Sequence, residues 1–228
     1  MTFNAIKQAI YGLYLTNSFG FRLRKTKDPM EKKRLRHAYS VAQLETLNIT
    51  IKIENEEKLP HDGQYLIISN HRSIIDPPIV EVMLQETNIF GPWISKKELY
   101  NSFFFGLFVR HAGSILLDRE KSQMSGFFAD IKEAVKRGES IFIFPEGTRN
   151  KSEKSLTSFK EGSRIIALKN RLDILPLYIK TNADEVLGNA LKDKSLKQEV
   201  IIEVGDLISY KDKTSLEENY RKTFGLVM

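Results

Sequence analysis

Three short apolar runs that each end in charged or turn-forming residues constrain the fold of this chain most strongly. The runs cover residues 65–68, 113–117 and 140–144, and their β-branched and aromatic residues are typical of strands. A helical pattern of apolar residues follows each run. Because strands that alternate with helices form mainly parallel sheets, the sequence predicts an α/β fold with a mainly parallel central sheet flanked by helices.

Charged residues follow these predicted strands directly. In a mainly parallel sheet, ligands bind in the crevice beyond the carboxyl ends of the strands. We therefore expect five side chains to converge at that edge, namely His71, Asp76, Arg119, Glu146 and Arg149.

His71 lies in the loop between the strand at residues 65–68 and a helix that begins near Asp76 and Pro77. These residue types predict Asp76 at the N-cap and Pro77 at the first helical position. If the loop brings the carboxylate to the imidazole, the histidine becomes a general base that works near neutral pH. The alternative is a surface histidine and a capping aspartate that do not touch.

The ordered motifs resemble those of the glycerolipid acyltransferase family, most closely its bacterial 1-acyl-sn-glycerol-3-phosphate acyltransferases. Residues 70–76 match the family's His-x4-Asp motif, and residues 113–119 resemble its second block. Residues 144–149 match the third block, and residues 174–177, which contain a proline, match the fourth. The resemblance covers about residues 48–180 and keeps the order of the family's motifs.

The resemblance implies transfer of a fatty acyl group from an acyl thioester to the sn-2 hydroxyl of 1-acyl-sn-glycerol-3-phosphate (lysophosphatidic acid), which gives phosphatidic acid. His71 would act as the general base, and Asp76 would fix its tautomer and stabilise the imidazolium. No covalent intermediate and no cofactor are expected, because the thioester is already activated. The co-substrate would be a thioester of acyl carrier protein (acyl-ACP) or of coenzyme A (acyl-CoA).

The resemblance implies that residues of the second and third motifs bind the substrate. The guanidinium groups of Arg119 and Arg149 suit the oxygens of a phosphate. We expect Glu146 to position a glycerol hydroxyl or to hold one of these arginines. Gly147 permits a close backbone approach or a positive φ angle, and Thr148 belongs to the same motif.

Several other chemistries are not expected. The chain has no cysteine, which excludes a thiol nucleophile and disulfides. The absence of a Gly-x-Ser-x-Gly motif argues against a serine hydrolase, and neither metal-ligand spacing nor a nucleotide-binding motif is present. Two alternatives stay open, namely an acyltransferase for another lysolipid or for glycerol-3-phosphate, and a non-catalytic lipid-binding protein of the same fold.

The N-terminal segment carries the excess positive charge. Residues 1–40 contain nine lysines and arginines against Asp28 and Glu31, a net charge of +7, while the whole chain carries +6. Asp28 and Pro29 predict the start of a second helix that runs to about Leu47. We therefore predict an amphipathic two-helix hairpin over residues 1–47 and an α/β acyltransferase domain over residues 48–228. Apolar residues recur at helical spacing in the first helix, at Phe3, Ile6, Ile10, Leu13 and Tyr14.

Such a basic, aromatic-rich hairpin suits the surface of an anionic membrane, where each lysine or arginine contributes about 1 kcal/mol. The alternative is that its apolar face packs on the protein itself. No run of 18 apolar residues occurs, so we expect a peripheral or monotopic protein at the cytoplasmic face of the cell membrane. Nucleic acid is not an expected partner, because no recognised nucleic-acid fold accompanies the charge. The aromatic rings of the segment 103–109 are expected to pack in the core or to line a groove for the acyl chain.

Overall fold

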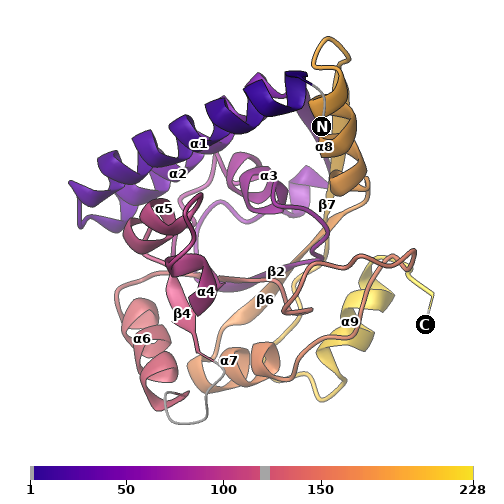
Figure 1. Ribbon diagram of the computed structural model, residues 1–228. Helices are drawn as coiled ribbons and strands as arrows, with labels where there is room; N and C mark the ends of the chain where they lie inside the picture. The colour runs from indigo at the N-terminus through magenta and orange to yellow at the C-terminus, as the bar shows by residue number, and fades with distance from the viewer. Residues whose placement is uncertain (1–2, 119–123, 228) are drawn as a thin grey trace.

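The computed structural model describes residues 3–118 and 124–227 (Figure 1). Within this part of the chain, the centre of the fold is a five-stranded sheet with the strand order β1-β7-β6-β2-β5. All of its pairs are parallel except β6–β7, so the predicted mainly parallel sheet is confirmed. Its strands are β1 (Ile49–Glu54), β2 (Tyr65–Ser69), β5 (Ile141–Ile143), β6 (Asp173–Ile179) and β7 (Gln198–Val204).

A second, two-stranded parallel sheet continues the β5 edge. It pairs β3 (Ile94–Lys96) with β4 (Ile115–Leu117). The segment before β3 runs beside β5, where the Phe142 amide donates to the Pro92 carbonyl at 3.0 Å. A Cβ atom on Gly91 would lie 1.8 Å from the Ser140 carbonyl oxygen, so only glycine permits this approach.

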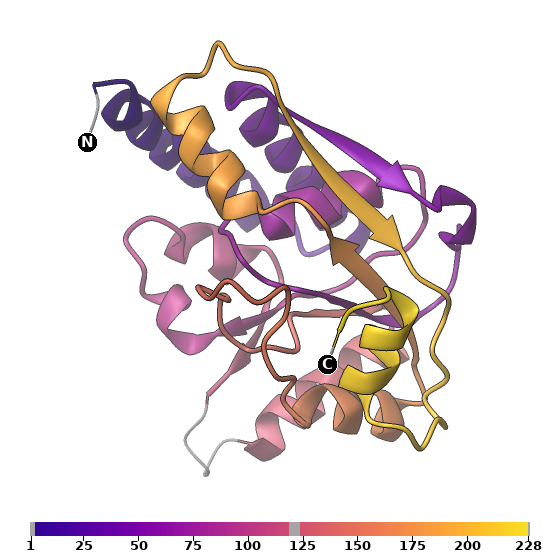
Figure 2. The same cartoon turned by 90° about the vertical axis from the view of Figure 1, so that its right-hand side faces the viewer.

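Helices cover both faces of the central sheet (Figures 1 and 2). In β2, Ile67 packs on one face with residues of α2, α3 and α8, whereas Leu66 and Ile68 pack on the other with residues of α6, α7 and α9. Both faces are therefore buried, as is usual for parallel strands. The helices on the two faces are α2 (Pro29–Thr46), α3 (Asp76–Met83) and α8 (Ala183–Lys192), and α6 (Met124–Lys136), α7 (Gly162–Asn170) and α9 (Leu216–Thr223).

The predicted N-terminal helices are present as α1 (Phe3–Arg24) and α2. Asp28 caps α2 as predicted, because its side chain accepts a hydrogen bond from the Met30 amide at 3.0 Å. Leu44 and Leu47 are buried in the same core as Ile67. The division of the chain at residue 47 therefore stays a prediction.

Helix α1 packs beside α2 and α5 (Gly106–His111), which follows the short helix α4 (Lys97–Tyr100). The inner face of α1 is buried, whereas four apolar side chains on its outer face are between 44% and 67% exposed. We call these four residues the α1 stripe: Ile6, Ile10, Tyr14 and Phe21. Among the residues that the structure describes, no helix combines the length and the apolar character needed to cross a membrane.

Candidate active site

The loop after β2 is fixed to the neighbouring strand and to α9. The Asn70 side chain donates to the Ile179 carbonyl at 3.0 Å and accepts from the Ile179 amide at 2.8 Å. The Asn70 amide donates to the Tyr220 hydroxyl, which in turn donates to the Leu177 carbonyl. This anchoring role of Asn70 was not anticipated, although the residue belongs to the recognised motif.

His71 and Asp76 meet in this loop. Nδ1 of His71 lies 2.8 Å from Oδ2 of Asp76, and the two side chains are 18% and 1% exposed, respectively. The same carboxylate oxygen accepts from the amides of Arg72 at 2.6 Å and Ser73 at 2.8 Å. Because Asp76 occupies Nδ1, the other ring nitrogen, Nε2, is the one left to take a proton.

The predicted start of α3 needs one correction. Ile75 occupies the N-cap, and Asp76 is the first helical residue, so Pro77 comes second. The Asp76 carboxylate turns back toward the three donors in the loop, and it therefore does not cap the helix that it begins.

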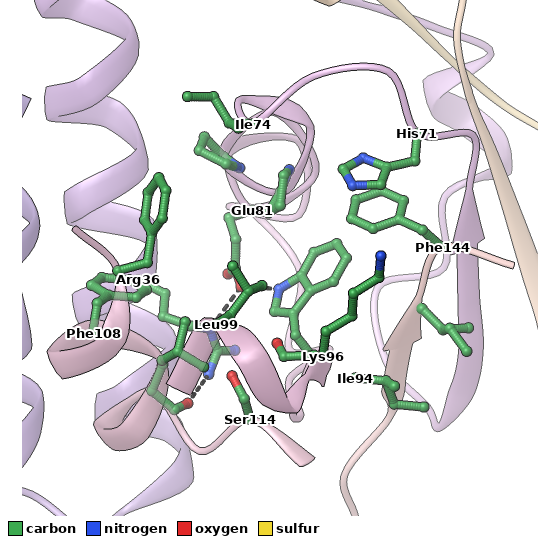
Figure 3. Close-up of a pocket in the computed structure, with 18 of the residues that line it drawn as sticks. Arg36, His71, Ile74, Glu81, Ile94, Lys96, Leu99, Phe108, Ser114 and Phe144 are labelled. Atoms are coloured by element: carbon green, nitrogen blue, oxygen red, sulfur yellow. Dashed lines mark hydrogen bonds and ion pairs between the residues drawn. The ribbon is translucent and has the colours of Figure 1, made fainter. Parts of the chain in front are cut away.

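The imidazole is also held by ring stacking. The His71 and Phe144 rings lie 4.0 Å apart at an interplanar angle of 7°. Figure 3 shows the two rings stacked on each other at the edge of a pocket. The strand end at β5 thus supports the histidine that follows β2.

Glu146 has other partners than those expected. Its side chain is buried, Oε1 accepts from the His71 amide at 2.7 Å, and Oε2 accepts from the Thr157 amide at 2.8 Å and from the Thr157 hydroxyl. The Asn150 amide donates to the His71 carbonyl at 2.6 Å. The loop after β5 therefore holds the backbone of His71 on both sides.

The turn that follows β5 completes this arrangement. Gly147 has a φ angle of +70°, in line with its predicted conformational freedom, and its amide donates to the Phe144 carbonyl at 2.9 Å. Thr148 and Arg149 are exposed and lie at the pocket.

The pocket beside His71 has a volume of about 390 Å³, which lies in the usual range for small-molecule sites. Figure 3 shows His71 and Phe144 on one side of it and Leu99 and Phe108 on the other. In the segment 103–109, which was expected to pack in the core or line an acyl groove, Phe105 and Phe108 line the pocket. Phe103 is instead 86% exposed. The polar lining includes His71, Lys96, Thr148 and Arg149, and the apolar lining includes Ile74, Pro77, Leu99, Phe105, Phe108 and Val109.

Comparison with known proteins identifies the family of this chain. The acyltransferase family model matches residues 50–180. The chain belongs to the acyltransferase family. The resemblance drawn from the motifs is thus confirmed, and the matched segment contains His71, Asp76 and the turn after β5.

Two bacterial members of the family illustrate the similarity. A 1-acyl-sn-glycerol-3-phosphate acyltransferase from Helicobacter pylori is 38% identical over 118 residues, which cover 51% of this chain and 48% of that protein. The corresponding protein from Borreliella burgdorferi is 30% identical over 162 residues, covering 70% of this chain and 62% of that protein. This acyltransferase chain thus matches about half to two thirds of the length of these curated relatives.

A solved structure has the same fold. The crystal structure of the 1-acyl-sn-glycerophosphate (LPA) acyltransferase from Thermotoga maritima superposes with a TM-score of 0.68. The match covers 96% of this chain and 91% of that one, at 20% sequence identity. It confirms the α/β architecture of the acyltransferase.

The pocket beside His71 also contains Lys96, a lysine that was not predicted as a site residue. Lys96, at the end of β3, lines the pocket, and its amino group points toward the rings of His71 and Phe144 (Figure 3). The neighbouring Lys97 instead forms an ion pair with Asp118 at 2.5 Å. The position of Lys96 at the end of a short strand was the available signal. The predicted Arg119 lies outside the described residues.

A buried ion pair forms the floor of the acyltransferase pocket. Nε of Arg36, from α2, lies 2.7 Å from Oε1 of Glu81, from α3, and both side chains are 5% exposed. The Arg36 guanidinium also donates to the carbonyls of Gly91 at 2.9 Å and Ala112 at 3.1 Å. Arg36 was counted with the other cations of residues 1–40, so its ion pair with Glu81 was not predicted. No group of three or more possible metal ligands occurs in the described part of the chain.

Proposed function

We propose that this acyltransferase moves a fatty acyl group from an acyl thioester to the sn-2 hydroxyl of lysophosphatidic acid, which gives phosphatidic acid. The observation that carries the proposal is the His71–Asp76 pair, which lies at a pocket with cations on its polar side and aromatic residues on its apolar side. The activities named for the bacterial relatives support the same substrate class.

His71 performs the proton transfers in this mechanism. Its Nε2 takes the proton of the sn-2 hydroxyl as the oxygen attacks the thioester carbonyl, and the imidazolium then gives that proton to the departing thiolate of the carrier. Asp76 stabilises the imidazolium through the 2.8 Å contact at Nδ1. The products are phosphatidic acid and the free thiol carrier, so the reaction balances without a cofactor or a covalent enzyme intermediate.

Cations at the pocket bind the phosphate of the acceptor in this proposal. Arg149 offers two parallel N–H donors, and Lys96 adds a point charge beside the base. We propose that Arg119 and Thr148 also bind the substrate, as expected from their motifs. Glu146 acts through the backbone of His71, as a positioning residue.

The apolar wall of the pocket suits a fatty acyl chain. Leu99 and Phe108 contribute hydrocarbon and aromatic surface opposite His71 (Figure 3), and Phe105 also lines the pocket. The acyl donor is a thioester of coenzyme A or of acyl carrier protein. Parallel assays with acyl-CoA and acyl-ACP show which donor the enzyme uses.

We further propose that the α1 stripe and the basic residues near it bind the surface of an anionic membrane. The stripe is exposed, and residues 1–40 carry a net charge of +7; without Lys33 and Arg36, which are buried, five net positive charges remain for the surface. Apolar insertion and electrostatic attraction then act together, as in other interfacial helices. The enzyme would thereby meet its lipid acceptor at the cytoplasmic face of the membrane.

Alanine substitution of the base tests the reaction. His71→Ala should lower kcat by about 10² to 10⁴, the usual contribution of a general base. The matched control is His61→Ala, because His61 also pairs with a carboxylate, Asp62 at 2.9 Å, but lies exposed elsewhere. Acyl transfer is measured over a panel of lysolipids and glycerol-3-phosphate.

Each alternative has its own outcome in this assay. A folded wild-type protein that releases no free carrier in the presence of any acceptor would be a non-catalytic lipid-binding protein. Preference for another lysolipid would reassign the acceptor, and unchanged turnover in His71→Ala would remove His71 as the base.

Vesicle binding tests the α1 stripe. The double variant Ile10→Ser with Tyr14→Ser should lose co-sedimentation with anionic vesicles, whereas Leu196→Ser, which alters another exposed apolar residue, should keep it. Salt should weaken but not abolish binding of the wild type, because salt screens only the electrostatic part. Full binding by the double variant would assign the membrane contact to another surface.

A further inference from the structure

Trp93 joins the buried ion pair to the rings beside the base. Its indole Nε1 donates to Oε1 of Glu81 at 2.8 Å, and the same oxygen lies 2.7 Å from Nε of Arg36. A single carboxylate oxygen therefore holds both the indole and the guanidinium. Because the Arg36 guanidinium and the indole donate to the same oxygen, Glu81 fixes the position of Trp93 relative to α2.

On its other side, Trp93 supports the ring on which His71 stacks. The Trp93 and Phe144 rings lie 5.0 Å apart at 29°, and Phe144 and His71 lie 4.0 Å apart at 7°. The three rings thus form a continuous stack. Figure 3 shows the His71 and Phe144 end of this stack, with Glu81 and Arg36 deeper in the pocket.

The main chain of Trp93 is fixed as well. Its carbonyl accepts from the Ile115 amide at 2.9 Å, and residue 93 forms a parallel bridge with Phe142 of β5. The indole therefore stands on a backbone that is held on two sides, and the Glu81 bond sets its orientation.

A single hydrogen bond fixes a point on an imidazole but leaves the ring plane free to tilt. Asp76 supplies that point at Nδ1 of His71. The plane, which decides where Nε2 points, is set by the contact with Phe144. A tilt of the ring would move Nε2 away from the attacking hydroxyl, and a misplacement of about 1 Å can cost about 10²-fold in rate.

We propose that Trp93 is a positioning residue for His71: held by Glu81 and Arg36, its indole backs the Phe144 ring and so fixes the plane of the imidazole. This role presupposes the general-base reaction proposed above. It also makes α2 a structural part of the active site, because Arg36 of that helix completes the support.

Two substitutions of Trp93 separate the ring from its hydrogen bond. Trp93→Leu removes the stacked ring, and Trp93→Phe keeps a ring but loses the donor to Glu81. We expect kcat to fall by between about 10- and 100-fold in Trp93→Leu and by an intermediate factor in Trp93→Phe. The KM values for the two substrates should change less than kcat does.

Nuclear magnetic resonance supplies a readout that needs no substrate. The chain has only four histidines, so the His71 ring protons can be assigned by comparison with His71→Ala. Stacking on Phe144 shifts these protons upfield by ring current. Loss of the support should move them downfield in Trp93→Leu, and less far in Trp93→Phe.

Phe127→Leu is the matched control. Phe127, in α6, is 6% exposed and belongs to the core that contains Leu66 and Ile68 on the other face of the sheet, so its loss also removes a buried ring. This variant should leave both kcat and the His71 resonances unchanged.

The outcomes separate this role from the proposed reaction. Downfield shifts confined to the two Trp93 variants, with a drop in kcat, support the positioning role. His71 resonances in folded Trp93→Leu that coincide with those of the wild type would overturn it, whether or not turnover falls. If Trp93→Leu does not fold, unshifted resonances in Trp93→Phe overturn the part played by Glu81 and Arg36. Lack of acyl transfer by the wild type would count against the proposed reaction and leave the resonance test intact.

Discussion

The charge of Asp76 can be removed while an oxygen acceptor stays in place for the loop. The carboxylate oxygen Oδ2 accepts from the amides of Arg72 and Ser73 as well as from His71. The other oxygen, Oδ1, is buried and has no hydrogen-bond partner in the described part of the chain. In Asp76→Asn, the amide oxygen must take the place of Oδ2, because an amino group there would face two backbone donors. His71 would keep an acceptor at Nδ1 and lose a neighbouring negative charge. The amino group would occupy the buried Oδ1 position without an acceptor, which should lower the free energy of unfolding by about 1–3 kcal/mol.

The size of the effect follows from the distance. A unit charge pair at 2.8 Å interacts by about 6 kcal/mol at an effective dielectric constant of about 20. The remaining hydrogen bond offsets part of this loss, so we expect the imidazolium to lose about half, roughly 3 kcal/mol. Since 1.36 kcal/mol corresponds to tenfold, kcat in Asp76→Asn should fall by roughly 10²-fold.

Steady-state acyl transfer at saturating donor and acceptor measures this change, and thermal unfolding checks that the variant folds. The control is Asp62→Asn, which neutralises the carboxylate of the exposed His61 pair. Asp76→Ala should additionally lower stability, by about 1–3 kcal/mol for each amide left without an acceptor. Turnover of folded Asp76→Asn within about threefold of the wild type would refute the reasoning, because the charge would then contribute almost nothing to the transition state.

Three further changes test other parts of the site. Arg149→Ala should raise the KM for lysophosphatidic acid by about tenfold, and Arg149→Lys should recover only part of the loss, because lysine keeps the charge without the paired donors; equal KM values would remove Arg149 from the phosphate site. Glu146→Gln should lower both kcat and the free energy of unfolding, the latter by about 1–3 kcal/mol in urea titrations, because its amino group would face the amide of His71 or Thr157; full stability would show that the buried carboxylate is not needed. Burial raises the pKa of Tyr220 well above its ordinary value, so above about pH 10 the unfolded chain loses this proton first and the free energy of unfolding falls as the pH rises. In Tyr220→Phe, urea titrations at increasing pH should show a shallower fall, by up to about 1.4 kcal/mol per pH unit, and identical slopes would contradict the assignment.

The sequence predicted the features that local patterns determine. The strand β2 was visible as an apolar run, and the Asp–Pro pair marked the start of α3 to within one residue. The proximity of His71 and Asp76 required only a short loop between these two elements. Four of the five predicted side chains lie in the described residues, and the order of the strands explains why His71 and Arg149 lie at one pocket.

The direction of individual side chains was not predictable in the same way. Glu146 faces Thr157, which lies in a segment without a periodic pattern, so its partners depend on a path that no local signal describes. Lys96 and Lys97 are chemically identical neighbours, and only the fold decides which one faces the pocket.

Buried charge was the other feature that sequence reasoning missed. Arg36 and Glu81 are 45 residues apart and belong to different helices. Burial of either charge alone would be strongly unfavourable, and it becomes tolerable only through their pairing and the added hydrogen bonds to backbone carbonyls. Such pairing is a property of the folded chain and leaves no periodic trace in the sequence.

The exposed apolar residues of α1 also determine how the purified protein will behave in a test tube. Ile6, Ile10, Tyr14 and Phe21 form one row along the helix, and in lipid-free buffer this row meets either water or the same row on another molecule. We expect size-exclusion profiles that shift toward larger species as the protein concentration rises and that detergent returns to the monomer position. An oligomer that forms only in lipid-free buffer would therefore use the surface that contacts the bilayer. Each vesicle co-sedimentation experiment needs a lipid-free control, because such oligomers can also sediment.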